Sequence, residues 1–189
     1  MEKKELVRKY IDDSIKSINL VYRNIDKIIE AAEIIIDSLK NGGKVLICGN
    51  GGSASQAQHF AGELVGRFEA ERKGLACIAL TTDTSIITSM ANDYNFNMVF
   101  EREVESLGNK GDVLIGLSTS GNSENIIRAI AKAREKELKV ITLIGKGGGK
   151  MLGIGDINLL IHAENTARIQ EAHLLMLHIL AKIIEDSFK

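Results

Sequence analysis

Apolar residues recur at helical spacing from Val7 to Leu39. The positions alternate between steps of four and three, and every member except Ser14 is apolar. The members are Val7, Ile11, Ser14, Ile18, Val21, Ile25, Ile28, Ala32, Ile35 and Leu39. This spacing predicts a bent or interrupted helix, or a helical hairpin, closed by Asn41, Gly42 and Gly43. Two interpretations stay open: the seam packs on the chain's own sheet, or it also builds a subunit interface.

After residue 43, short apolar runs alternate with helical segments. The runs predicted to be buried strands are 44–48, 75–80, 113–118, 140–144 and 157–162. The predicted helices cover 54–68, 84–107 with a break near 92–97, 124–137 and 166–188. Alternating strands and helices indicate right-handed crossovers, so the predicted fold class is α/β, a mostly parallel sheet with helices on both faces. We divide the chain into N-terminal helices, 1–43, and one α/β domain, 44–189.

Composition and charge narrow the class of protein. The chain is 44% hydrophobic and 26% charged, with a formal net charge of -1, as is typical of soluble globular proteins. Basic and acidic residues nearly balance, which gives no reason to expect nucleic acid as a partner. The charged N-terminus lacks the apolar core of a signal peptide, and no run is long enough to span a membrane. Cys48 and Cys77 lie in apolar runs that suit reduced, buried thiols, which favours a cytoplasmic protein.

Two loops of similar composition follow predicted strands. Ligands of parallel sheets bind at the carboxyl ends of the strands, where these loops lie. The first contains Asn50, Gly51, Gly52 and Ser53, and the second contains Ser118, Thr119, Ser120, Gly121, Asn122 and Ser123. Glycines let main-chain amides approach an anion, hydroxyls donate to it, and the helix that follows adds free N–H groups. Either loop alone could be an ordinary capped turn, but the two together favour a phosphate site.

Titratable and amide side chains occur at helical spacing on two predicted helices. His59 and Glu63 are four residues apart, and Gln170 and His178 lie on one face of the last helix with His173 nearby. The alternatives are a surface pair for the first two and a satisfied core histidine for His178. A histidine and a carboxylate at this spacing form no zinc motif, so spacing alone predicts no metal.

Three segments resemble the sugar isomerase (SIS) domain family. Two carry the loops, GNGGSASQAQHFAGELVGRF and GLSTSGNSENIIRAI, and the third, TARIQEAHLLMLHIL, is similar to the C-terminal helix of the phosphoheptose isomerases within that family. The likeness runs from about Val45 to the C-terminus, with a looser match in the N-terminal helices. The resemblance implies a single flavodoxin-like domain with a five-stranded parallel sheet, and a homotetramer whose active sites lie between subunits.

The resemblance also implies an activity. It is the aldose-ketose isomerisation of sedoheptulose 7-phosphate to D-glycero-D-manno-heptose 7-phosphate through an enediol, the first step of nucleotide-activated heptose biosynthesis. Glu63 matches the catalytic base and His178 the second acid–base group, and no nucleotide cofactor is implied. The implied substrate-binding residues are Asn50, Gly51, Gly52, Ser53, Glu63, Asn92, Asp93, Ser118, Thr119, Ser120, Ser123 and Gln170. The residues that match a zinc site, one per subunit, are His59, Glu63, Gln170 and His178.

One departure from the family pattern and two rival functions accompany this resemblance. Gln56 stands where an acidic residue is often found in relatives, which could alter contacts with substrate hydroxyls. The first rival is a non-catalytic SIS protein that binds the replication initiator. The second is an isomerase of another phosphosugar, such as a pentose or hexosamine phosphate, or a sugar-phosphate-sensing domain. The presence of His59, Glu63 and His178 favours an enzyme, because a scaffold has no need of those groups.

Overall fold

The computed structural model describes residues 2–189, in which helices and strands alternate along the chain. The strands are β1 (Val45–Gly49), β2 (Cys77–Ala79), β3 (Val113–Ser118), β4 (Lys139–Gly145) and β5 (Ile157–Ile161). The helices are α1 (Lys3–Asn19), α2 (Ile25–Lys40), α3 (Gly52–Val65), α4 (Thr84–Asp93), α5 (Val99–Leu107), α6 (Glu124–Glu135) and α7 (Thr166–Asp186). Short 3-10 turns are η1 (Leu20–Asn24), η2 (Phe96–Met98) and η3 (Gly149–Met151).

The strands form one parallel sheet in the order β2-β1-β3-β4-β5. Every residue of β1 and β3 is buried, as expected of strands covered by helices on both faces. In the register of the sheet, Gly49 pairs with Leu117 and Ser118 pairs with Ile144. The carboxyl ends of β1, β3 and β4 therefore meet at one edge, and the predicted α/β fold class is confirmed.

The element boundaries differ from the predicted ones where local geometry decides them. The apolar run 75–80 forms only a three-residue strand, β2, because it lies at the sheet edge and pairs with β1 alone. The helix predicted from residue 54 begins at Gly52, after a glycine at position 51 whose φ is +54°. The break predicted in 84–107 is confirmed, since Asn95 starts η2 by accepting a hydrogen bond from the Asn97 amide at 3.0 Å.

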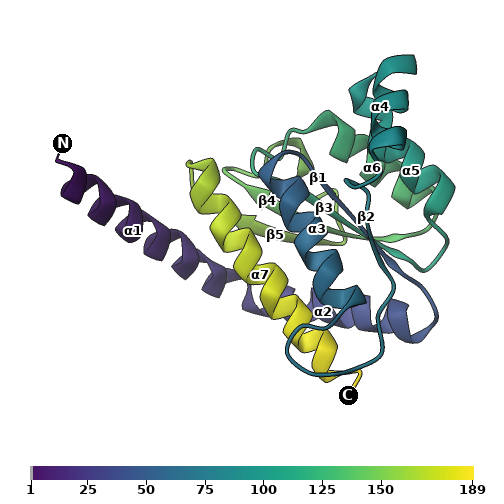
Figure 1. Ribbon diagram of the computed structural model, residues 1–189, viewed down its shortest axis with the longest axis horizontal. Coiled ribbons are helices and arrows are strands. Elements are labelled where there is room, and N and C mark those ends of the chain that lie inside the picture. The colour runs from purple at the N-terminus through teal and green to yellow at the C-terminus, as the bar shows by residue number, and fades with distance from the viewer. Residues whose placement is uncertain (1) are drawn as a thin grey trace.

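Two hydrophobic cores lie on opposite faces of the sheet. One packs α2, α3 and α7 against the sheet, around fully buried side chains such as Phe60 and Leu177. The other packs α5 and α6 against the opposite face, around Val104 and Ile130. In α4 only Met90 is buried, and this helix projects from the end of the fold (Figure 1). We refer to the helices that pack on the first face, with their core, as the α3/α7 layer, and to those on the opposite face as the α5/α6 layer.

The N-terminal seam divides into a buried half and an exposed half. The break or bend predicted somewhere in the seam falls at η1, and beyond it Ile28 and Ile35 pack against the sheet with 3% and 0% of their surface exposed. Before the break, Val7 and Ile11 are 58% and 55% exposed on α1, which extends away from the domain (Figure 1). Within residues 2–189, no helix combines the length and apolar character needed to cross a bilayer.

Candidate active site

Helices α3 and α7 bring two imidazoles and a carboxylate together. The Nε2 atoms of His59 and His178 are 2.9 Å apart, although 119 residues separate them in sequence. The same His59 nitrogen lies 2.9 Å from a carboxylate oxygen of Glu63, its neighbour one helical turn away. His59 is exposed, and the other two are half-buried, so solvent and ligands reach the cluster. The acid–base groups proposed from the sequence therefore share one site within a single chain.

The two helices run in the same direction, and this places Gln170 away from the cluster. A Cβ added to Gly52 at the start of α3 would lie 2.4 Å from the Gln170 Nε2 atom. His59 follows Gly52 by seven residues, about 10 Å along the helix axis. Gln170 likewise precedes His178 by eight residues, about 12 Å. Within one chain, the amide of Gln170 therefore lies beside the first loop and not beside the two imidazoles.

The donor set of the cluster suits a divalent transition metal. His59, Glu63 and His178 each offer one ligand atom, and these atoms all lie within 4.8 Å of one another. Two histidines and one glutamate form a known catalytic zinc ligand set, which leaves a fourth position for water or substrate. The residues that are present therefore fit a zinc ion with three protein ligands from this chain.

The serine loop after β3 turns its hydroxyls toward one another. The Ser118 hydroxyl lies 2.9 Å from that of Ser123 and 3.3 Å from that of Ser120. The turn needs a glycine at 121, where φ is +65° and an added Cβ would lie 1.9 Å from the Gly148 carbonyl oxygen. Ser123 stands at the N-cap of α6 without capping it through its side chain. Thr119 is half-buried in the same turn. Hydroxyls and free helix amides thus converge at one point, which suits an anion.

A pair of amide side chains joins the first loop to α6. Asn50 donates to Asn125 at 2.9 Å and accepts from it at 2.8 Å. The predicted loop residue Asn50 is therefore held beside the serine loop, while Ser53 is buried behind it. Asn125 is 2% exposed and was missed by the sequence analysis. Its signal was a polar residue on the buried side of an amphipathic helix.

Asn92 and Asp93 lie at the end of α4. Both are exposed in the last turn of α4, where the Asn92 amide donates to the Asp93 carboxylate at 2.9 Å. Among residues 2–189, neither side chain forms a hydrogen bond with the two loops. Their predicted contact with sugar hydroxyls stays a prediction.

Gln56 links α3 to the backbone of α7. Its Nε2 donates to the main-chain carbonyl of Gln170 at 2.6 Å, and the side chain is buried. Its Oε1 atom is buried and has no hydrogen-bond partner among the described residues. The departure from the family pattern thus lies about one turn after the start of α3 and one turn before His59, where it joins α3 to α7.

Three further residues near the cluster were also missed. The Phe68 ring lies 5.7 Å from the His178 ring, between centroids. Arg72 and Glu185 are buried below it, with side chains 1% and 0% exposed. Phe68 was placed at the end of the predicted helix 54–68, but α3 ends at Val65 and Phe68 lies in a segment without regular structure, where helical periodicity gives no information on its contacts.

The remaining candidate titratable groups are inert by their environment. Cys48 and Cys77 are free and buried, as predicted, and burial raises the pKa of Cys77 to about 12. His173 is fully buried behind β4, and burial lowers its pKa to about 4, so the ring is neutral at physiological pH. His173 therefore belongs to the core and not to the acid–base cluster.

Comparison with known proteins places the chain in a family. A family model described as SIS domain matches residues 9–145. A phosphoheptose isomerase of Helicobacter hepaticus is 53% identical over 96% of this chain and 92% of its own length. The structure of a phosphoheptose isomerase from Francisella tularensis matches with a TM-score of 0.95, at 41% identity, over 98% of this chain and 100% of that one. One from Neisseria gonorrhoeae gives a TM-score of 0.93, at 42% identity, with the same coverage. The chain belongs to the SIS domain family, in its phosphoheptose isomerase branch.

Proposed function

We propose that this protein is an aldose-ketose isomerase that converts sedoheptulose 7-phosphate to D-glycero-D-manno-heptose 7-phosphate, the first step of nucleotide-activated heptose biosynthesis. The observation that carries the proposal is the cluster of His59, Glu63 and His178, beside a parallel sheet whose loops suit a phosphate. Relatives that match nearly the whole chain carry the name phosphoheptose isomerase.

In this proposal, the serine loop binds the phosphate of the substrate and the first loop lines its sugar chain. Hydroxyls of Ser118, Ser120 and Ser123, with Thr119 and the free amides of α6, bind the phosphate. Asn50, Gly51, Gly52 and Ser53 line the sugar chain beside it, and Asn92 and Asp93 contact its hydroxyls. Fixing the phosphate orients the opposite end of the heptose, and that orientation lowers the entropic part of the barrier.

Proton transfer is assigned to Glu63 and His178. The Glu63 carboxylate takes the proton from the carbon next to the carbonyl, which leaves an enediol-type intermediate. The same proton returns to the neighbouring carbon, while His178 moves a proton between the two oxygens. The 2.9 Å contact between His178 and His59 orients the imidazole for this transfer.

A divalent metal, zinc as the family resemblance implies, is proposed to bind His59, Glu63 and His178 in a state distinct from the one in which Glu63 and His178 transfer protons, because a coordinated imidazole nitrogen has no lone pair free for a proton. When bound, such an ion supplies Lewis-acid stabilisation of developing negative charge on oxygen. Gln170 completes the four-residue set only if it comes from another subunit, because within one chain it lies beside Gly52. An active site between subunits therefore agrees with the position of this side chain.

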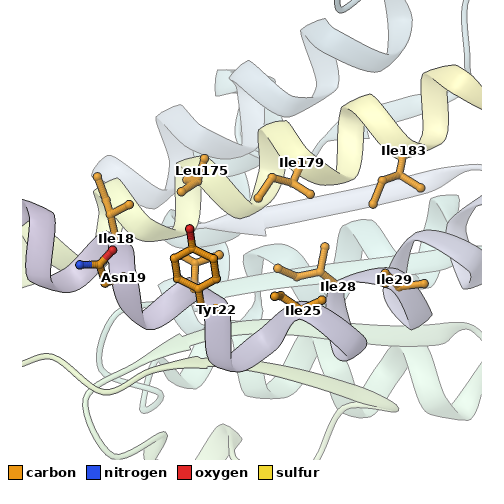
Figure 2. Close-up of a pocket in the computed structure, with 10 residues that line it drawn as sticks. Ile18, Asn19, Tyr22, Ile25, Ile28, Ile29, Leu175, Ile179 and Ile183 are labelled. Atoms are coloured by element: carbon orange, nitrogen blue, oxygen red, sulfur yellow. The ribbon is translucent and has the colours of Figure 1, made fainter.

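A homotetramer is proposed on the same grounds, and an apolar groove supports it. The groove lies between the N-terminal helices and α7, where Ile18, Tyr22 and Ile25 face Leu175, Ile179 and Ile183 (Figure 2). Tyr22 is 73% exposed and Ile25 is 49% exposed. Covering such side chains with a second copy removes apolar surface from water. Light scattering should report a tetramer, and Ile25→Asp should shift it toward smaller species.

We expect the protein to act in the cytoplasm, where soluble phosphosugars are available.

Turnover of sedoheptulose 7-phosphate by the purified protein tests the function. The product is separated from substrate by anion-exchange chromatography, and the mutant Glu63→Gln is assayed in parallel. We expect the substitution to reduce kcat by roughly 10²–10⁴-fold, the typical contribution of a positioned proton-transfer group. Activity that survives Glu63→Gln would overturn the assigned base. Phosphate binding without turnover in the wild type would favour a binding module instead.

A panel of aldose and ketose phosphates separates the substrate from its rivals. Pentose and hexosamine phosphates should be turned over less efficiently than the heptose phosphate. A preference for a shorter phosphosugar would replace the proposed substrate while leaving the acid–base assignment intact.

A further inference from the structure

We propose that Glu185 and Arg72 form a positioning pair that fixes the relative orientation of α3 and α7, and thereby that of Glu63 and His178. The inference deepens the proposed function and rests on it. The pair lies outside the acid–base cluster, and none of its atoms reaches the reacting groups.

The Glu185 carboxylate accepts hydrogen bonds from the segment that follows α3. Its Oε1 accepts the Phe68 amide at 2.9 Å, and its Oε2 accepts the amides of Glu69 and Ala70 at 3.0 and 2.9 Å. Burial acts to raise the pKa of Glu185, but these three amides and Arg72 outweigh it, and the pKa is lowered. The carboxylate is therefore ionised at neutral pH and accepts from three consecutive residues at once.

Arg72 closes the last turn of α3. Its guanidinium donates to the main-chain carbonyls of Glu63 at 2.7 Å and Leu64 at 2.8 Å. Its Nε lies 3.7 Å from the Glu185 carboxylate, so the two charges compensate each other in the interior. The arginine thus bonds directly to the backbone of the proposed catalytic base, whose carbonyl is otherwise at the open end of a helix.

Glu185 and Arg72 are each connected to a residue of the acid–base cluster. Glu185 follows His178 by seven residues, which places both on one face of α7 about two turns apart. The Phe68 amide bonds to Glu185, and the Phe68 ring lies 5.7 Å from the His178 ring. On α3, the carbonyl bonded by Arg72 belongs to Glu63 itself. A shift of the pair would therefore move the carboxylate and the imidazole relative to each other.

Stability alone is a weak reason for such a pair. Removing two charges from water costs several kcal/mol per ion, and apolar residues of similar volume are often as stable as a buried ion pair. An apolar pair could not fix the local geometry in this way, since the hydrogen bonds of Glu185 and Arg72 specify the positions of three amides and four carbonyls. A displacement of about 1 Å in a catalytic group can cost roughly 100-fold in rate.

Glu185→Gln removes the negative charge that compensates Arg72 and disturbs one of the three main-chain contacts. If the new Oε1 accepts from Glu69 and Ala70, the new amide nitrogen faces the Phe68 amide, and two donors oppose each other. We expect kcat to fall roughly 10–100-fold, the usual range for groups that orient a site from outside it. KM should change less than kcat, because the phosphate loop is untouched. Arg72→Lys, which keeps the charge but loses the planar fork, should act in the same direction.

Asp112→Asn is the matched control. Asp112 is also buried, accepts from two main-chain amides, those of Lys44 and Asn109, and pairs with the Lys44 ammonium. It precedes β3, at the opposite edge of the sheet from the loops. The control should lower the melting temperature and leave kcat unchanged. Equal kcat values for wild type, Glu185→Gln and Asp112→Asn, measured well below each melting temperature, would overturn the proposal.

Phe68→Leu keeps the test available if Glu185→Gln does not fold. It retains both charges and every main-chain bond, and it removes only the ring beside His178. We expect roughly a tenfold loss of kcat. Unchanged kcat in Phe68→Leu would overturn the link from the pair to the imidazole.

A measurement that needs no turnover separates failure of this inference from failure of the proposed function. Ring ¹⁵N chemical shifts of His59 and His178 are recorded at one fixed pH in histidine-labelled protein, with assignments from His178→Gln. Glu185→Gln and Phe68→Leu should move the His178 signals, and Asp112→Asn should not. Signals that stay in place in the first two variants contradict the positioning role, whatever substrate the enzyme uses.

Discussion

Each helical layer buries a glutamate, and the two carboxylates meet opposite conditions. In the α3/α7 layer, Glu185 accepts from three main-chain amides beside Arg72, and its pKa is lowered even though burial acts to raise it. In the α5/α6 layer, Glu103 is 4% exposed, and its Oε2 has no partner among the described residues. Burial, with a smaller contribution from the charge of Asp83, raises the pKa of Glu103 to about 8.

The difference shows that donors, and not burial, decide which layer carries charge. A buried carboxylate stays ionised where amides and an arginine meet it, and takes up a proton where they are missing. The α3/α7 layer uses its charged carboxylate beside the acid–base cluster, whereas the α5/α6 layer holds a neutral one in an apolar core. The same residue type therefore serves orientation in one layer and packing in the other.

Removing the chemistry from the α3/α7 layer should give the largest effect. We expect His178→Gln to lower kcat by roughly 10²–10⁴-fold, because a positioned acid–base group is lost. The melting temperature should change little, since the side chain is half-buried at the surface of the layer. His162→Gln, at an exposed histidine just after β5, serves as the control in the same assay. Comparable kcat in the two variants would contradict the division between layers.

The second-largest effect should come from a substitution in the serine loop, which connects β3 to α6 of the α5/α6 layer. In Gly121→Ala the new methyl meets the Gly148 carbonyl in a backbone with φ of +65°. Gly42→Ala is the matched control, since φ is +82° there and nothing lies within 4 Å of the added Cβ. Left-handed strain alone costs about 1–2 kcal/mol, so denaturant unfolding should show that loss in Gly42→Ala and a larger one in Gly121→Ala. Equal losses of unfolding free energy in the two variants would mean that the serine loop accommodates the methyl group without a steric cost.

The neutral carboxylate should appear as a pH dependence of stability. The pKa of Glu103 is about 8 in the folded chain, above its ordinary value of 4.5, so the folded state binds more protons between these values. Stability contributed by this group is present at low pH and is lost as pH rises from about 4.5 to about 8. We expect Glu103→Gln to flatten that part of the profile of melting temperature against pH. A wild-type profile identical to that of the variant would show that Glu103 is ionised in the fold.

The smallest effect should follow from Asp83→Asn. Asparagine can still cap α4 through the bonds that Asp83 now accepts from the amides of Ser85 and Ile86. The substitution removes the like charge that contributes to the raised pKa of Glu103. The midpoint of the stability loss should therefore move to lower pH by a small amount. Movement to higher pH would show that a different group raises the pKa.

The sequence sufficed for the features that depend on period and turn chemistry. Alternating apolar runs predicted the parallel sheet, and the helical seam predicted a break or bend without its position, which the structure places at η1. Spacing put His59 and Glu63 on one face, and the structure adds His178 to them. The exposure of the first half of the seam could not be predicted. The same helical spacing of apolar residues occurs on a helix face that packs against its own domain and on one that is left uncovered.

The positioning residues were beyond sequence reasoning for a physical reason. Arg72 and Glu185 are 113 residues apart, and each resembles an ordinary surface charge when read alone. Their importance arises from main-chain groups, which carry no sequence signal. Asn125 differs, because its partner is a side chain: its position on the buried side of an amphipathic helix was a signal, but the partner Asn50, 75 residues away, could not be identified from it.

The contact between the Nε2 atoms of His59 and His178 has a consequence for biosynthesis of the chain. The two anion loops and α3 leave the ribosome early, but the second imidazole arrives only with the terminal helix. The cluster is therefore incomplete until α7, whose apolar side chains fill the core on that face of the sheet, has docked. On the proposed function, competence would follow the docking of α7 and the assembly of the subunits, and loss of that helix by proteolysis would abolish it.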